Sequence, residues 1–153
     1  MKFTAFFLGV WLFTGIAGTA LAAPTMDVTG GWVREAPPTS RVLAGYMQIN
    51  NLTDADITIT GVSSPDFDSA ELHRTVVEGG VASMQAVPEL VVPAAGSVLL
   101  EPGSLHLMLF DPVRSLLQGD SVTLVLHRSD GICLTLSVPV LRSTGEEHIH
   151  QHH

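Results

Sequence analysis

The chain is poor in cysteine, lysine and aromatic residues. Cys133 is its single cysteine, so no intramolecular disulfide can form and the fold must be held by its hydrophobic core. Lys2 is its only lysine, and the residues after position 22 contain six arginines against 15 acidic residues, a net charge near −9. An acidic surface without lysine argues against binding to nucleic acid or to anionic lipid. We therefore expect neither as a partner.

Helical periodicity and catalytic motifs are also missing. No long stretch repeats its apolar residues at helical spacing, and at most a turn or two of helix fits near residues 65–69 or 114–118. The sequence contains no HExxH motif, no phosphate-binding loop and no nucleophile–base motif. We therefore expect that the protein is not an enzyme.

Residues 1–22 have the features of a secretory signal. Lys2 gives a positive start, residues 6–17 form a short apolar core, and Ala20-Leu21-Ala22 fits a small-x-small cleavage site. A membrane anchor is the alternative, but the apolar run is short and no charged stop follows it. No cysteine follows this core, so a lipid-anchored start has no support. We expect export to a bacterial periplasm, without stable membrane insertion once the signal is removed.

Short β-type runs fill most of the remaining 131 residues. Many alternate apolar and polar residues, and Pro, Gly, Asn and Asp separate them. The runs cover residues 31–35, 43–50, 57–62, 70–77, 81–87, 97–101, 106–110, 121–128 and 132–140. This spacing predicts a single all-β domain over residues 23–141, an antiparallel sandwich or barrel. Residues 142–153 are polar and predict a flexible tail.

The most informative motif is His106-Leu107-Met108, within one of these apolar runs. Side chains alternate between the two faces of a strand, so His106 and Met108 project together while Leu107 projects from the other face. An imidazole beside a thioether suits Cu(I) better than a hard cation. The motif therefore predicts half of a soft-metal site.

A second His/Met pair, His73 and Met84, flanks a chain reversal at Glu78-Gly79-Gly80. If the reversal centres on Glu78-Gly79, the two side chains face each other directly, whereas a one-residue bulge would make them diagonal. In both cases they lie on one face and can approach closely. A fold that joins the two strand regions would form a site of two histidines and two methionines.

The spacing of these residues is specific. Ten residues separate His73 from Met84, 21 separate Met84 from His106, and one separates His106 from Met108. With its flanking sequence, the pattern resembles the periplasmic copper chaperone family PCu(A)C over residues 31–140. The resemblance also rests on Trp32-Val33-Arg34, Tyr46, Asn50, Ser63-Ser64-Pro65, Glu71-Leu72, Pro102-Gly103 and Leu109. Leu105 stands where the family often has an aromatic residue.

The resemblance implies a cupredoxin-like β-sandwich of Greek-key type with Cu(I) as its metal. By the same likeness the Cu(I) ligands would be His73, Met84, His106 and Met108. The implied role is copper delivery to a partner protein, notably the dinuclear copper site of cytochrome c oxidase or a thiol-bearing assembly factor. A copper sequestration or resistance protein needs the same ligands and stays open as an alternative. A structural adhesion-type sandwich would bind no Cu(I).

Other candidate residues have less support. A blue-copper site requires a thiolate with two histidines and a weak axial methionine, and no His or Met follows Cys133 in that pattern. We expect a structural role for Cys133, a surface position for His127, a core position for Met47 and a mobile Met26 near the cleavage site. Asn51-Leu52-Thr53 is a formal glycosylation sequon, to which we give little weight in a bacterial protein.

The C-terminal tail contains a second candidate metal site, of different chemistry. Its neighbouring imidazoles favour Cu(II) among divalent ions. These residues are His148, His150, His152 and His153. A solvated tail or the remnant of a purification tag is the alternative. As a hypothesis, the tail captures Cu(II) weakly while the His/Met site holds Cu(I).

Overall fold

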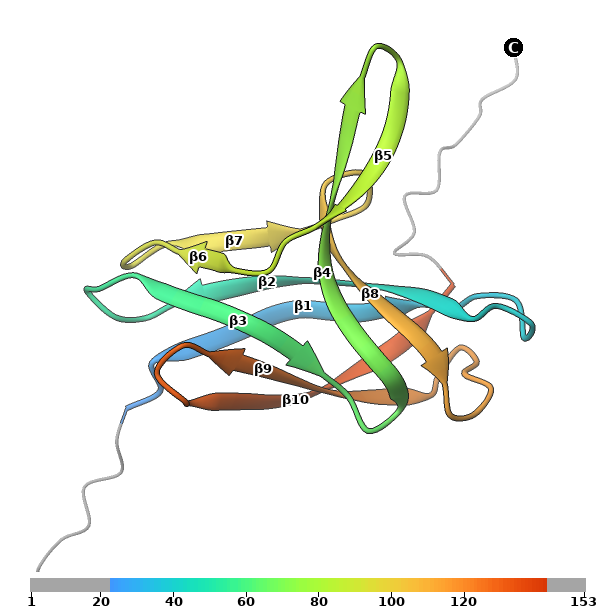
Figure 1. The fold of residues 1–153 in the computed structure, drawn as a ribbon. Helices are drawn as coiled ribbons and strands as arrows, with labels where there is room; N and C mark the ends of the chain where they lie inside the picture. Colours follow the sequence, from blue (N-terminus) through green and yellow to red (C-terminus); the bar gives the residue numbers. More distant parts are fainter. Residues whose placement is uncertain (1–22, 143–153) are drawn as a thin grey trace, which may run out of the picture.

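The structure is a computed structural model that describes residues 23–142, and over this range it contains ten strands and no helix (Figure 1). The helical turns that the sequence allowed near residues 65–69 and 114–118 do not form. Within the described range, no helix is long and apolar enough to cross a membrane. The strands are β1 Met26–Arg34, β2 Val42–Asn51, β3 Ile57–Ser63, β4 Phe67–Glu78, β5 Val81–Ala86, β6 Leu90–Val92, β7 Ser97–Leu100, β8 Leu105–Pro112, β9 Ser121–Arg128 and β10 Cys133–Leu141.

Seven of these strands close into a barrel. In the order β4-β8-β2-β1-β10-β9-β3 each strand pairs with the next, and β3 returns to β4 where Val62 pairs with Ala70. All of these pairs are antiparallel except β1 with β10, which is parallel. The remaining strands extend the sheet: β5 from β4, β6 from β3 and β7 from β2. The predicted single all-β domain of cupredoxin-like sandwich or barrel type is thus confirmed.

The start of β1 and the presence of β6 differ from the sequence prediction. β1 begins at Met26, which pairs with Asn51 of β2 and is buried in the core, so the expectation of a mobile Met26 is wrong. The sequence does not predict β6, which is only three residues long and lies between Pro88 and Pro93. Such a short run shows too little alternation to be recognised as a strand.

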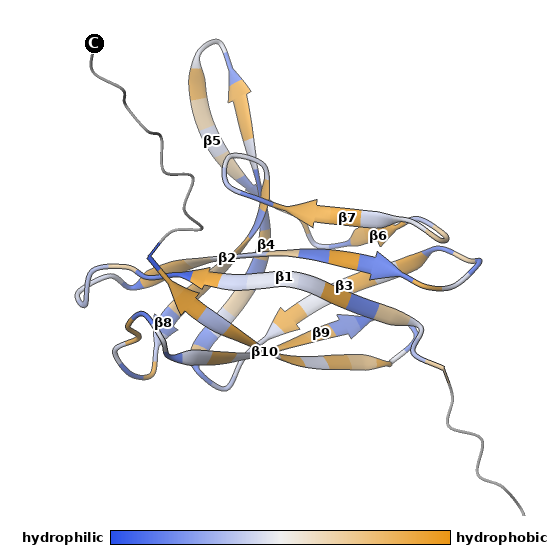
Figure 2. Ribbon diagram, turned by 180° about the vertical axis from the view of Figure 1, so that it is seen from behind, coloured by the Kyte–Doolittle hydropathy of each residue, from blue (hydrophilic) through white to orange (hydrophobic). Residues whose placement is uncertain are grey.

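The barrel interior is filled by the inward-facing residues of alternating strands. Leu105, Leu107 and Leu109 of β8 all point inward and are buried, as is the expected core residue Met47 of β2. Figure 2 shows the corresponding alternation of orange with white or blue segments along the strands. Burying a side chain of this size stabilises the fold by about 1.5–3 kcal/mol. Because β8 presents its leucines to the core, its even-numbered residues lie on the outer face of the barrel.

β4 and β5 form an arm that leaves the barrel (Figure 1). β4 pairs with β8 over its first part, up to Arg74, and with β5 over its last part. A two-residue turn at Gly79 and Gly80 joins the arm's strands, and both glycines have positive φ, as a type I′ hairpin turn requires. Every residue of β5 is exposed.

Candidate metal centre

β4 and β8 place His73 directly opposite His106 on the outer face of the barrel. Their ring centroids are 6.4 Å apart and the ring planes are inclined by 37°. A metal ion about 2.1 Å from a ring nitrogen lies roughly 3.2 Å from the centroid of that ring. The 6.4 Å separation of the two imidazoles matches the spacing expected for one ion between them.

Met108 follows His106 on the same face of β8, as the sequence alternation predicted. It is half-buried, whereas His106 is 5% exposed. The Nδ1 of His106 donates a hydrogen bond to the carbonyl oxygen of Ser104 over 3.0 Å. In this neutral tautomer the lone pair of His106 lies on Nε2, which is the atom available to a metal.

Met84 lies diagonally across the arm from His73. The reversal centres on Gly79-Gly80 rather than on Glu78-Gly79, so His73 pairs with Ala86 while Met84 pairs with Thr75. The direct pairing of His73 with Met84 is therefore not found, and the diagonal arrangement is the one observed. The period of two still puts both side chains on one face, within reach for a long side chain. Met84 is 59% exposed and occupies the open edge of the site.

Sequence reasoning did not give a role at this site to Glu71. It lies two residues before His73 on β4, and its Oε2 is 2.8 Å from His73 Nε2. The other ring nitrogen of His73, Nδ1, is buried and has no hydrogen-bond partner among the described residues. The i, i+2 spacing on a strand was the signal that could have identified Glu71.

The predicted donor set would favour a soft ion. Two imidazoles and two thioethers carry no charge and suit Cu(I), for which thioethers are good ligands. Within residues 23–142, no group of three or more His, Cys, Asp and Glu side chains could hold a metal ion. The methionine sulfurs are the further donors that the sequence predicts for a metal at the His73–His106 pair.

Next to β8 in the sheet, β2 and β1 carry aromatic side chains in register with His106. Gly45 pairs with Leu107, so the next position of β2, Tyr46, is in register with His106. Trp32 of β1 pairs with Tyr46, with ring centroids 4.8 Å apart. The guanidinium carbon of Arg34 lies 5.9 Å from the Trp32 ring and 5.8 Å from the Tyr46 ring. Trp32, Tyr46 and Arg34 thus form a stacked cluster on β1 and β2.

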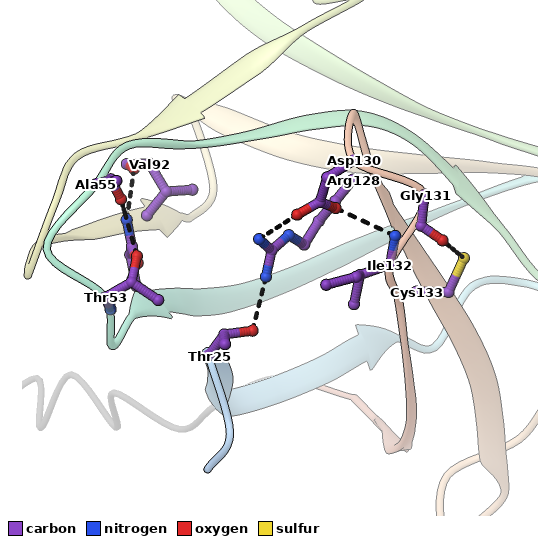
Figure 3. A network of polar contacts seen from close by, with 10 residues as sticks. Thr25, Thr53, Ala55, Val92, Arg128, Asp130, Gly131, Ile132 and Cys133 are labelled. Carbon is purple, nitrogen blue, oxygen red and sulfur yellow. Dashed lines mark hydrogen bonds and ion pairs between the residues drawn. The ribbon is translucent and has the colours of Figure 1, made fainter. Parts of the chain in front are cut away.

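Cys133 lies apart from the His/Met group, at the start of β10. Its Sγ is exposed and 3.3 Å from Nδ1 of His127, whose Nε2 is 2.7 Å from the hydroxyl of Ser63. The neighbouring loop is fixed by Arg128, which binds both Thr25 and Asp130 (Figure 3).

Asn51, the first residue of the formal sequon, has a structural role. Its amide is buried, and Nδ2 lies within hydrogen-bond distance of the carbonyl oxygens of Ala55, Val92 and Pro93. The expected signal over residues 1–22 lies outside the described residues. So do the tail histidines His148, His150, His152 and His153.

The chain has relatives among known proteins. Residues 26–140 match the family described as "Putative lipoprotein LpqE-like". The protein named "Putative lipoprotein Lxx21020" from Leifsonia xyli subsp. xyli is 30% identical over 124 residues, which are 80% of this chain and 74% of that protein. Protein RP573 of Rickettsia prowazekii is 27% identical over 78% of this chain and 62% of its own length.

Solved structures share the fold. The Cu(I)-bound solution structure of DR1885 from Deinococcus radiodurans is 34% identical, covers 82% of this chain and 83% of that one, and has a TM-score of 0.64. The copper-bound PCuAC domain from PmoF2 is 20% identical, covers 80% of this chain and 97% of that domain, and has a TM-score of 0.66. The chain therefore belongs to the LpqE-like family and has the fold of PCuAC domains.

Proposed function

We propose that this protein is an exported copper chaperone that binds Cu(I) and passes it to a partner protein. The ligands would be His73, Met84, His106 and Met108. One observation carries the proposal: His73 and His106 face each other with Met108 on the same outer face, and a buried nitrogen of His73 lacks a partner among the described residues. The Cu(I)-bound DR1885 structure, 34% identical, supports the choice of metal.

The donor chemistry favours transfer over permanent storage. Neutral imidazoles and thioethers hold Cu(I) without a thiolate, so a partner that offers thiolates can compete for the ion. Met84 is largely exposed on the arm, where an acceptor can approach it. The acceptor would be an oxidase copper domain, such as the dinuclear site of cytochrome c oxidase, or a thiol-bearing assembly factor. A sequestration protein would use the same ligands without delivery.

The two ends of the chain would add export and a second, weaker copper site. Residues 1–22 would direct the chain to a bacterial periplasm, in keeping with a relative named as a lipoprotein. The histidines at positions 148, 150, 152 and 153 would capture Cu(II) weakly, and no catalytic activity is proposed.

Titration of Cu(I) against a chromophoric chelator tests the site. We expect one tightly bound Cu(I) in the wild type and a loss of affinity in His106→Ala and in Met108→Ala. His127→Ala removes an imidazole elsewhere on the barrel and should leave the affinity unchanged. Wild-type affinity in both site variants would overturn the assignment.

A transfer assay separates delivery from sequestration. Copper-loaded protein is mixed with an apo oxidase copper domain, and the copper in each protein is measured after separation. Movement of copper to the acceptor supports a chaperone. Retention of all copper at equilibrium supports sequestration.

A further inference from the structure

We infer that Glu71 is a positioning residue of this site, holding the ring of His73 so that Nδ1 faces the ion. The inference rests on the proposed copper site for the identity of the ion. The hydrogen bond on which it depends belongs to the protein without metal: Glu71 Oε2 lies 2.8 Å from His73 Nε2. A carboxylate only accepts hydrogen bonds, so Nε2 carries the proton in this pair.

The tautomer leaves the lone pair of His73 on Nδ1. That atom is buried and has no partner among residues 23–142. Buried polar atoms without a partner are uncommon in folded proteins, because leaving such an atom without water or a partner costs free energy. A metal between His73 and His106 would satisfy this nitrogen.

The two imidazoles thus donate from different ring nitrogens. His106 donates from Nδ1 to the carbonyl of Ser104 and offers Nε2, whereas His73 donates from Nε2 to Glu71 and offers Nδ1. A metal-binding histidine characteristically donates its second N–H to a carboxylate or a carbonyl, which fixes the ring and strengthens the ligand. Both kinds of partner are present here, one for each histidine.

The position of Glu71 in the sheet fits this role. It pairs with Met108 across the β4–β8 ladder, just as His73 pairs with His106. Glu71, His73, His106 and Met108 thus form a compact block on one face of two paired strands. The Glu71 side chain is 53% exposed, whereas that of His73 is 13% exposed, so the carboxylate lies at the rim and the imidazole beneath it.

Two substitutions separate positioning from direct ligation. In Glu71→Gln the amide oxygen can still accept the Nε2 proton, so a positioning role is largely retained. In Glu71→Ala the acceptor is lost. Loss of an outer-shell partner typically weakens metal binding by about 10–100-fold. We expect that loss of Cu(I) affinity in Glu71→Ala and wild-type affinity within a few-fold in Glu71→Gln. Glu78→Ala, at the tip of the same strand, is the matched control.

The ring tautomer gives a readout that needs no copper. Long-range ¹H–¹⁵N correlation spectra of the apo protein should show His73 protonated at Nε2 in the wild type and in Glu71→Gln. In Glu71→Ala, Nδ1-protonated His73 should appear. Wild-type tautomer and affinity in Glu71→Ala would overturn the inference, and so would a Glu71→Gln variant as weak as Glu71→Ala. Failure of the wild type to bind Cu(I) would instead refute the proposed function, while the spectra still test the Glu71–His73 contact.

Discussion

His73 and His106 face each other across the β4–β8 ladder, with ring centroids 6.4 Å apart. A one-residue slip of either strand would turn its imidazole into the core, because side chains alternate with a period of two. Leu72 and Leu107 also pair across this ladder and are buried, so the core fixes the register that the site requires. The core therefore holds the two imidazoles opposite each other, whereas Met84, the proposed ligand on the arm, is exposed.

Met84→Leu should weaken copper binding without destabilising the fold. The change removes the thioether but keeps an apolar side chain of similar size at an exposed position. Surface substitutions of this kind usually change the free energy of unfolding by less than about 0.5 kcal/mol. Chelator competition should show weaker Cu(I) binding, and urea denaturation should show an unchanged midpoint. Met47→Leu in the core is the control, with unchanged Cu(I) affinity. Wild-type affinity in Met84→Leu would exclude Met84 as a ligand.

Leu107→Ala should destabilise the barrel more than Met108→Ala does. Leu107 is fully buried, and its Cβ lies 3.3 Å from the position that a Cβ at Gly45 would occupy, so β8 and β2 pack closely at this point. Large-to-small core substitutions of leucine cost about 2–5 kcal/mol. Urea denaturation gives the free energy of unfolding. Half-buried Met108 provides the comparison, and a smaller loss in Leu107→Ala than in Met108→Ala would contradict the inward orientation of Leu107.

Asn51→Ala should destabilise the loop between β2 and β3. The Asn51 amide donates to carbonyl groups of two separate segments, and its Oδ1 accepts from the Thr53 backbone and hydroxyl. Leaving buried polar groups unpaired costs about 1–3 kcal/mol. Thermal unfolding should report the loss, and Asn50→Ala on the same strand is the control. An equal loss of stability in both variants would contradict the assignment of this loss to the Asn51 amide.

Nine of the ten strands, and the shared face of His106 and Met108, follow from local sequence pattern, whereas the pairing of the strands does not. Alternation located β9 at its observed bounds and put His106 and Met108 on one face. The pairing of His73 with His106 joins segments separated by the whole arm and by β6 and β7, so no turn between them reveals the register. The arm's own register depends on which residues of Glu78-Gly79-Gly80 form the turn, and the positive φ of both glycines decides it.

Acid should destabilise the protein in part through Asp120. The backbone N–H of Leu117 donates to its carboxylate over 2.8 Å, and Arg114 adds a second contact, so the pKa of Asp120 is lowered in the folded protein. A carboxyl group whose pKa is lower when folded contributes stability above its unfolded pKa of about 3.9, and that contribution disappears as the pH falls through the folded pKa. Asp120→Asn should therefore flatten the decline of the unfolding midpoint below about pH 4. A parallel profile in Asp120→Asn and wild type, measured by thermal unfolding at several pH values, would contradict the role of the Leu117 hydrogen bond.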